Sequence, residues 1–163
     1  MQGESVGSII KHIINSGLVG RLNIIRKVKE VSKKGESNGA FPRQTPDQRI
    51  FKMVLLTKEK RKEIPAMYSQ DGLGGDAIAC LKMFTPDSSW TWYVIEGESV
   101  LDEDDKVIDF CFFGMVDGFE KELGYFLLSE LEKIKGPLGL PIERDLYWKP
   151  TKLKDIFPEL YRD

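Results

Sequence analysis

The amino-acid sequence predicts an α+β fold, with a small and mostly antiparallel sheet of about four to five strands and flanking short helices. An N-terminal amphipathic helical arm is predicted to precede this sheet. Runs rich in β-branched and aromatic residues follow one another in the second half of the chain, and tight links between them favour antiparallel pairing. A chain of 163 residues with 41% hydrophobic content can bury the core of one domain that carries an appendage.

The first 34 residues form the predicted arm, because apolar residues recur there every three or four positions, as on one face of a helix. Its later part is basic, and the cations singled out are Arg21, Arg26, Lys27 and Lys29. Amphipathic helices usually bury their apolar stripe on protein, so we expect packing on the same chain or self-association. A partner's hydrophobic groove, nucleic acid and a membrane surface are the alternatives.

Glycine, proline and small polar residues dominate residues 35–48, which is typical of a linker. The predicted organisation is therefore an arm at 1–34, a linker at 35–50 and an α+β domain at 51–163. Thr57 is expected to cap a short charged helix over Lys58–Glu63, which Pro65 ends.

Three strands are predicted next, over Ala77–Phe84, Thr91–Glu96 and Val107–Val116. Pro86 lies in the tight turn between the first two, and the acidic loop Gly97–Lys106 joins the second to the third. The third run is apolar at nearly every position, which indicates a central strand covered on both faces.

A fourth strand is predicted over Leu123–Leu127. The segment Ser129–Glu132 has serine followed three positions later by glutamate, the capping-box pattern at the start of a helix, and Gly136 ends that helix. An extended stretch over Ile142–Trp148 and a short helix near Lys152–Phe157 complete the chain.

Charge is distributed unevenly along the chain, although the total is only −2. Residues 1–70 hold 14 Lys/Arg and 6 Asp/Glu, a balance of +8, whereas residues 71–163 hold 10 and 20, a balance of −10. The basic half can attract a phosphate backbone or an acidic partner, or it can lie against the acidic half of the same molecule.

Two cysteines and one histidine are too few and too scattered for a common zinc site. Cys80 and Cys111 lie in apolar runs and are expected to be structural thiols, while His12 lies in the arm. The start of the chain lacks a signal-peptide pattern, and no apolar run is long enough to cross a membrane, so we expect a cytoplasmic protein.

Five motifs, which span residues 53 to 160 approximately, resemble one bacterial family in order and spacing. They are Leu55–Glu59, Lys82–Tyr93, Phe112–Gly114, Glu122–Phe126 and Gly139–Tyr147. The chain is similar here to the domain-of-unknown-function family numbered 2958. The resemblance implies a bacterial mobile element or phage, with anti-restriction and DNA-processing genes as neighbours, and cytoplasmic work. It implies no activity and no cofactor.

Aromatic residues crowd the second predicted strand, where Trp90 and Trp92 point to one face and Tyr93 to the other. An exposed aromatic face beside basic residues would stack the bases of single-stranded nucleic acid. Aromatic strand residues usually pack in a core instead, and this half of the chain is acidic. The basic residues nearest to these rings in the predicted domain are Lys82, Arg144 and Lys149.

Glu143 and Asp145 are expected to share one face of an extended segment, with Arg144 on the other. Arg144 could bind a phosphate or carboxylate. The two carboxylates could hold a divalent ion together with Asp109 or Glu96, as in a small metal-dependent hydrolase or nuclease. An ion-pair network that anchors the segment is the competing interpretation.

The leading hypothesis is a non-enzymatic binding module that recognises a protein or nucleic acid, and the hydrolase or nuclease is the alternative. No phosphate-binding glycine motif occurs, and the only histidine lies in the arm, so we predict no catalytic set, no cofactor and no metal site. The predicted binding residues are Trp90, Trp92, Tyr93, Glu143, Arg144, Asp145 and Lys149, with the four arm cations named above.

Overall fold

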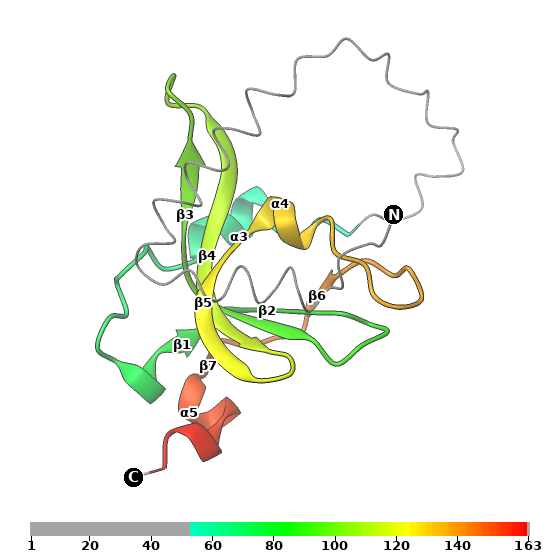
Figure 1. The fold of residues 1–163 in the computed structure, drawn as a ribbon. Helices are drawn as coiled ribbons and strands as arrows, with labels where there is room; N and C mark the ends of the chain where they lie inside the picture. Colours follow the sequence, from blue (N-terminus) through cyan, green and yellow to red (C-terminus); the bar gives the residue numbers. More distant parts are fainter. Residues whose placement is uncertain (1–52, 163) are drawn as a thin grey trace.

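The computed structural model describes residues 53–162 (Figure 1). The predicted arm at 1–34, with its four cations, and the linker at 35–50 lie outside the described residues. Within residues 53–162, no helix has the length and hydrophobicity that a membrane span requires.

A five-stranded sheet forms the centre of the fold, and every neighbouring pair in it is antiparallel, as predicted. The predicted central strand is confirmed, because β4 lies inside the sheet and most of its residues are buried. Across the sheet the strands are β5 (Lys121–Leu127), β4 (Val107–Asp117), β3 (Thr91–Leu101), β2 (Leu81–Phe84) and β6 (Glu143–Arg144).

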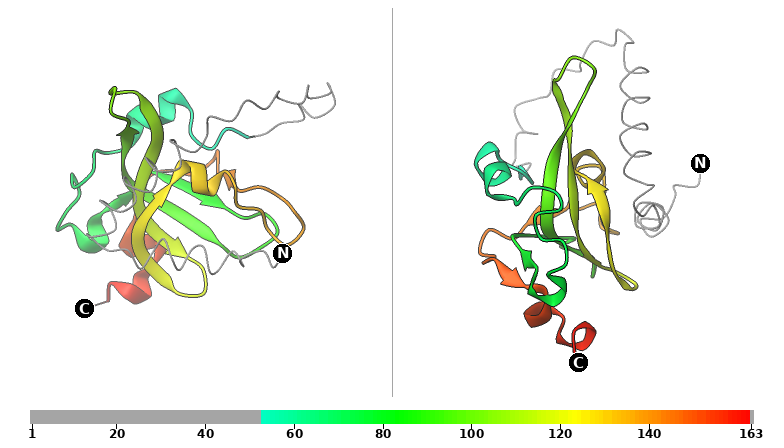
Figure 2. Two further views of the ribbon diagram at one scale, coloured as in Figure 1. Left: turned by 45° about the horizontal axis from the view of Figure 1, so that its top comes forward. Right: turned by 90° about the vertical axis from the view of Figure 1, so that its left-hand side faces the viewer.

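Short elements surround this sheet. Figure 2 shows the long β3–β4 hairpin extending from one end of the molecule, with the C-terminal helix near the opposite end. A two-stranded sheet joins β1 (Ile78–Ala79) and β7 (Thr151–Lys152). The helices are α3 (Lys58–Glu63), α4 (Leu128–Leu131) and α5 (Leu153–Ile156), with 3₁₀ turns η2 (Gly74–Asp76) and η3 (Pro158–Leu160).

Of the two predicted helix caps, Thr57 is confirmed and Ser129 is not. Thr57 caps α3 as predicted, because its Oγ1 accepts a hydrogen bond from the Lys60 amide at 3.2 Å. Ser129 is not the cap of α4, which begins one residue earlier. The hydroxyl and amide of Ser129 donate instead to the carboxylate of Asp109. The Glu130 carboxylate accepts a hydrogen bond from the Leu127 amide.

One predicted strand is split in the structure and another is extended. The first is split, because the chain leaves β1 for β2 at Cys80, whose amide and thiol both donate to the carbonyl of Val94. The second continues past Glu96 to Leu101 beside β4, after a register shift between Val94 and Glu96. Such bulges change the register and turn side chains, so the simple alternation used for the prediction ends there.

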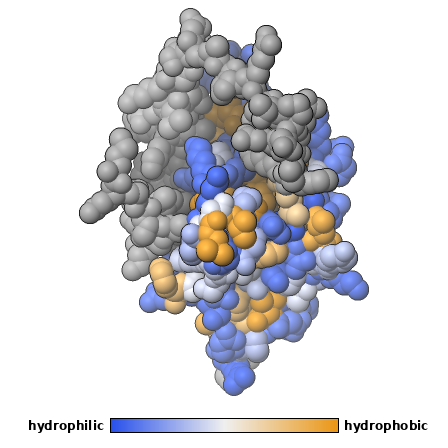
Figure 3. Space-filling view, turned by 90° about the vertical axis from the view of Figure 1, so that its right-hand side faces the viewer, coloured by the Kyte–Doolittle hydropathy of each residue, from blue (hydrophilic) through white to orange (hydrophobic). Residues whose placement is uncertain are grey.

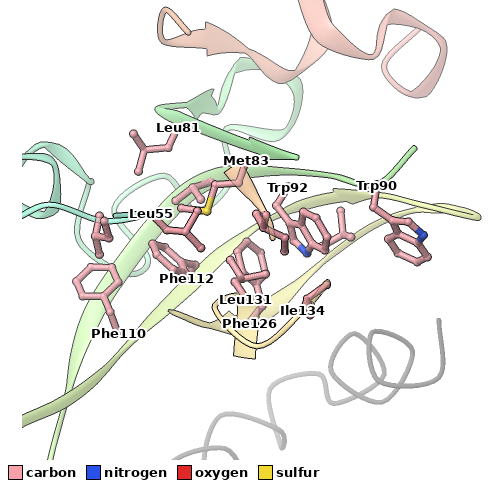
Figure 4. Packing of buried hydrophobic residues seen from close by; sticks show 14 of the residues in the cluster. Leu55, Leu81, Met83, Trp90, Trp92, Phe110, Phe112, Phe126, Leu131 and Ile134 are labelled. Atoms are coloured by element: carbon pink, nitrogen blue, oxygen red, sulfur yellow. The ribbon is translucent and has the colours of Figure 1, made fainter. Parts of the chain in front are cut away.

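The main core lies on one face of the sheet and contains both Trp90 and Trp92 (Figure 4). Helix α4 and the chain after it contribute Leu131 and Ile134 to this core. A second cluster on the other face includes the half-buried ring of Tyr93. The predicted alternation of these three aromatic side chains between the two faces is therefore confirmed.

Candidate functional site

A cleft of about 580 Å³ opens between the β2–β3 turn and the segment that contains β6. This volume falls in the range of ligand-binding clefts in proteins. Its walls come mainly from two parts of the chain that are far apart in sequence, and Met53 adds to them. The lining residues are Met53, Lys82, Phe84, Thr85, Pro86, Ser88, Ser89, Trp90, Thr91, Glu143, Arg144, Asp145, Leu146 and Tyr147.

The β2–β3 turn is closed at its base by Thr85 and Trp90. The Thr85 amide donates to the Trp90 carbonyl at 3.0 Å, and the Trp90 amide donates back to Thr85 Oγ1 at 3.2 Å. Thr85 is buried, so its hydroxyl satisfies a backbone amide that water would reach poorly. The turn thereby has a defined shape at the edge of the cleft.

Asp87 ties this turn to the loop 136–140. Its Oδ2 accepts hydrogen bonds from the amides of Leu138, at 2.8 Å, and Leu140, at 3.4 Å. Gly136 lies so close to the Asp87 carboxylate that a β-carbon there would collide with it. The loop therefore presents Leu138, which is 81% exposed, from a position fixed by the β2–β3 turn.

Cross-strand register places three residues of the cleft in one row. Thr91 lies opposite Phe84, and Phe84 lies opposite Glu143, so their side chains share a face of the sheet. The next row holds an ion pair, in which Lys82 Nζ lies 3.5 Å from Asp145 Oδ2. Glu143 and Asp145 therefore share a face, as predicted.

Arg144 points to the opposite face, also as predicted. Its Nη1 donates to the Leu55 carbonyl at 3.1 Å, and its backbone amide contacts Met53 Sδ. One part of the guanidinium thus fixes the chain that leads into α3. Arg144 also lines the cleft.

Trp90 and Trp92 pack in the core, the second of the two alternatives that the sequence left open, and do not form an exposed aromatic face. Trp92 is 1% exposed and Trp90 is 9% exposed, and the two rings stack with centroids 6.2 Å apart inside the main core. Alternation along a strand tells which side chains share a face, and here residues from α4 and the following chain cover that face. Trp90 still reaches the cleft, but Trp92 does not line it.

Two further predicted residues lie away from the cleft lining. Tyr93 packs edge-to-face against Trp148 and Phe157, with centroids 5.5 and 5.1 Å away, and burial raises the pKa of its phenol. Lys149 is exposed and does not line the cleft. Of the predicted domain residues, the structure brings Trp90, Glu143, Arg144 and Asp145 together there.

The other carboxylates of the hydrolase alternative have separate partners. Glu96 is 2% exposed and accepts hydrogen bonds from the amides of Tyr68 and Gln70. Asp109 is 8% exposed and is bonded to Ser129. Neither lines the cleft, and the described residues contain no group of three His, Cys, Asp or Glu side chains placed to hold a metal ion.

Sequence reasoning missed an exposed apolar rim, by which we mean Phe119, Leu138, Leu146 and Tyr147. Their exposed fractions are 79%, 81%, 62% and 93%. Phe119 packs on Trp90 with centroids 5.3 Å apart, and the other three are held beside the same turn. Figure 3 views the side on which the β2–β3 turn projects, where hydrophobic patches lie among hydrophilic ones. The signal available was apolar residues inside turn sequences.

Comparison with known proteins gives one informative match. The family model described as "Protein of unknown function (DUF2958)" matches residues 55–159. No curated protein matches the chain, and no solved structure does.

Proposed function

The chain belongs to this family of proteins of unknown function, and we propose that its domain is a binding module that recognises a protein partner. The contact surface is the end of the sheet around the β2–β3 turn, with the exposed apolar rim outside and the cleft in the middle. We place its work in the bacterial cytoplasm, on a mobile element or phage, where it serves anti-defence or DNA processing. That setting rests on the family alone.

The exposed apolar rim carries the proposal. Large apolar side chains that are mostly exposed and gather near one turn are typical of protein-binding surfaces, and Leu146 and Tyr147 also line the cleft. The backbone beneath them is held by long-range contacts, among them the Asp87 hydrogen bonds to the loop 136–140. Contacts of this kind keep the side chains in place before binding, which reduces the entropy lost on association.

Charge favours protein over nucleic acid as the partner. Residues 53–162 hold 14 Lys/Arg and 21 Asp/Glu, a balance of −7. Among the cleft residues, Lys82 and Arg144 are offset by Glu143 and Asp145. A polyanion gains affinity mainly by neutralisation of its phosphates, and this domain offers no excess of cations for that. The basic arm is proposed to add contacts or to mediate self-association.

Site-specific photo-crosslinking of the full-length protein in its native host tests this proposal. A photoreactive amino acid replaces Tyr147 in one variant and Val107, which is 51% exposed at the far end of the β3–β4 hairpin, in the other. We expect a protease-sensitive adduct of defined mass from position 147 and none from position 107. Equal adducts from both positions, or an adduct removed by nuclease, would contradict the proposal.

A further inference from the structure

Glu143 ends the row of Thr91, Phe84 and Glu143 and carries a charge that no other described residue pairs with. The Glu143 carboxylate has no hydrogen-bond or ion-pair partner within residues 53–162, although it is half-buried. Side chains directly opposite each other on antiparallel strands have β-carbons about 4.5–5.5 Å apart, so the Phe84 ring lies beside this carboxylate. A carboxylate that is partly removed from water in this way favours an incoming cation.

Neighbouring charges are already engaged. Lys82 pairs with Asp145 at 3.5 Å and lies over the Trp148 ring, 5.4 Å from its centroid. Asp145 also accepts a hydrogen bond from the Tyr147 amide at 3.0 Å. Arg144 is bonded on the opposite face to the Leu55 carbonyl. Lys82 and Asp145 therefore neutralise each other, and on their face of the sheet Glu143 is the charged cleft residue that has no ion-pair partner within residues 53–162.

We infer that the cleft binds a lysine or arginine side chain of the partner protein, with Glu143 as its counter-ion, an inference that rests on the proposed function. Phe84 and Tyr147 line the same cleft, and aromatic rings attract a cation over their faces. The hydroxyls of Ser88 and Ser89 are available at the rim of the turn for the partner's backbone.

An anionic group is the less favourable occupant. A phosphate or an acidic side chain would lie beside Glu143, and like charges directly beside each other repel. The acidic balance of the whole domain acts in the same direction.

Selection of peptides measures this preference directly. A random peptide library displayed on phage is selected against the full-length protein, and a selected peptide is then titrated by fluorescence anisotropy. We expect lysine or arginine to be enriched in the selected peptides. Glu143→Gln should weaken the peptide about ten-fold, because a charge-assisted hydrogen bond becomes a neutral one. Glu143→Lys should reverse the preference and select acidic peptides.

Two controls separate this inference from the proposed function. Asp104→Asn, which removes an exposed carboxylate at the far hairpin end, should leave the affinity unchanged. Selected peptides that Tyr147→Ser weakens, but that lack basic residues and bind Glu143→Gln as well as the wild type, would overturn the inference and leave the proposed function standing. Selection that yields no peptide weakened by Tyr147→Ser would overturn both.

Discussion

The two ends of the sheet each carry a turn in which one aspartate accepts two backbone amides, yet the partners differ. At the end of the β3–β4 hairpin, Asp102 Oδ1 accepts from Asp104 and Lys106, both at 2.9 Å. At the other end, Asp87 Oδ2 accepts from Leu138 and Leu140, more than fifty residues along the chain. The first turn is closed on itself, whereas the second joins distant segments.

The contacts that hold each turn determine whether its backbone can keep exposed side chains in place. A turn that is held only by its neighbours in sequence can change shape without disturbing the core, and an acidic, solvated sequence suits it. Apolar side chains that remain exposed need a backbone that keeps them apart from one another and in place. The β2–β3 turn supplies such a backbone, because the core residue Trp90 closes it and the loop 136–140 is bonded to it.

The largest effect should come from the core beneath the β2–β3 turn. Trp92→Ala removes a side chain that is 1% exposed, and we expect the free energy of unfolding to fall by about 3–5 kcal/mol because a large cavity remains. Leu101→Ala, at a site 41% exposed near the other end, should change it by less than about 0.5 kcal/mol. Urea unfolding followed by fluorescence measures both. Similar losses of stability in the two variants would contradict the proposed difference between the two ends of the sheet.

The second-largest effect on stability is expected from the aspartates of the two turns, Asp87 and Asp102. Asp87→Ala should lower the free energy of unfolding by about 1–2 kcal/mol, because two charge-assisted hydrogen bonds between distant segments are lost. Asp102→Ala should cost less, since water replaces the carboxylate at the exposed tip.

Hydrogen exchange of individual amides distinguishes the loss of a contact between distant segments from the loss of a contact within one turn. In Asp87→Ala, the amides of Leu138 and Leu140 should lose protection, far from the substituted position in sequence. In Asp102→Ala, the change should stay within the β3–β4 turn. Loss of protection confined to the β2–β3 turn in Asp87→Ala would show that the loop 136–140 keeps its shape without this carboxylate.

Local and periodic features were the predictable part of this molecule. Thr57 caps α3, the apolar run of β4 lies inside the sheet between β5 and β3, and Glu143 and Asp145 share a face. Each of these outcomes depends on residues close in sequence or on the two-residue period of a strand. The same period placed Trp90 and Trp92 together correctly.

The environment of each face could not be predicted in this way. Which face is buried depends on what packs over it, and Leu131 and Ile134, which cover Trp92, are some forty residues further along the chain. The cleft likewise depends on the pairing of Glu143 with Phe84, and no local signal specifies that partner. Leu138 is exposed because Asp87 holds its loop, which is again a long-range contact.

The smallest effect tests a long-range contact that is fully exposed. Asp76 Oδ1 lies 2.8 Å from both Lys152 Nζ and Lys154 Nζ, and the hydrogen bond from Lys152, followed by that from Lys154, lowers the pKa of this carboxyl from 3.8 to about 2. The ionised form is therefore favoured in the folded state. Its contribution is complete above pH 3.8 and is lost as the pH falls through about 2.

The unfolding midpoints of the wild type and of Asp76 variants should show this dependence on pH. Wild type should exceed Asp76→Asn by a small margin at neutral pH, and the margin should disappear toward pH 2 and shrink in high salt, because exposed ion pairs are screened. Lys152→Met should raise the pKa of the Asp76 carboxyl toward 3.8, as followed by NMR. A large, salt-independent difference in midpoint would show that an exposed long-range ion pair can hold distant segments as firmly as the Asp87 contacts do. Exposure would then not limit the contribution of a long-range contact to stability.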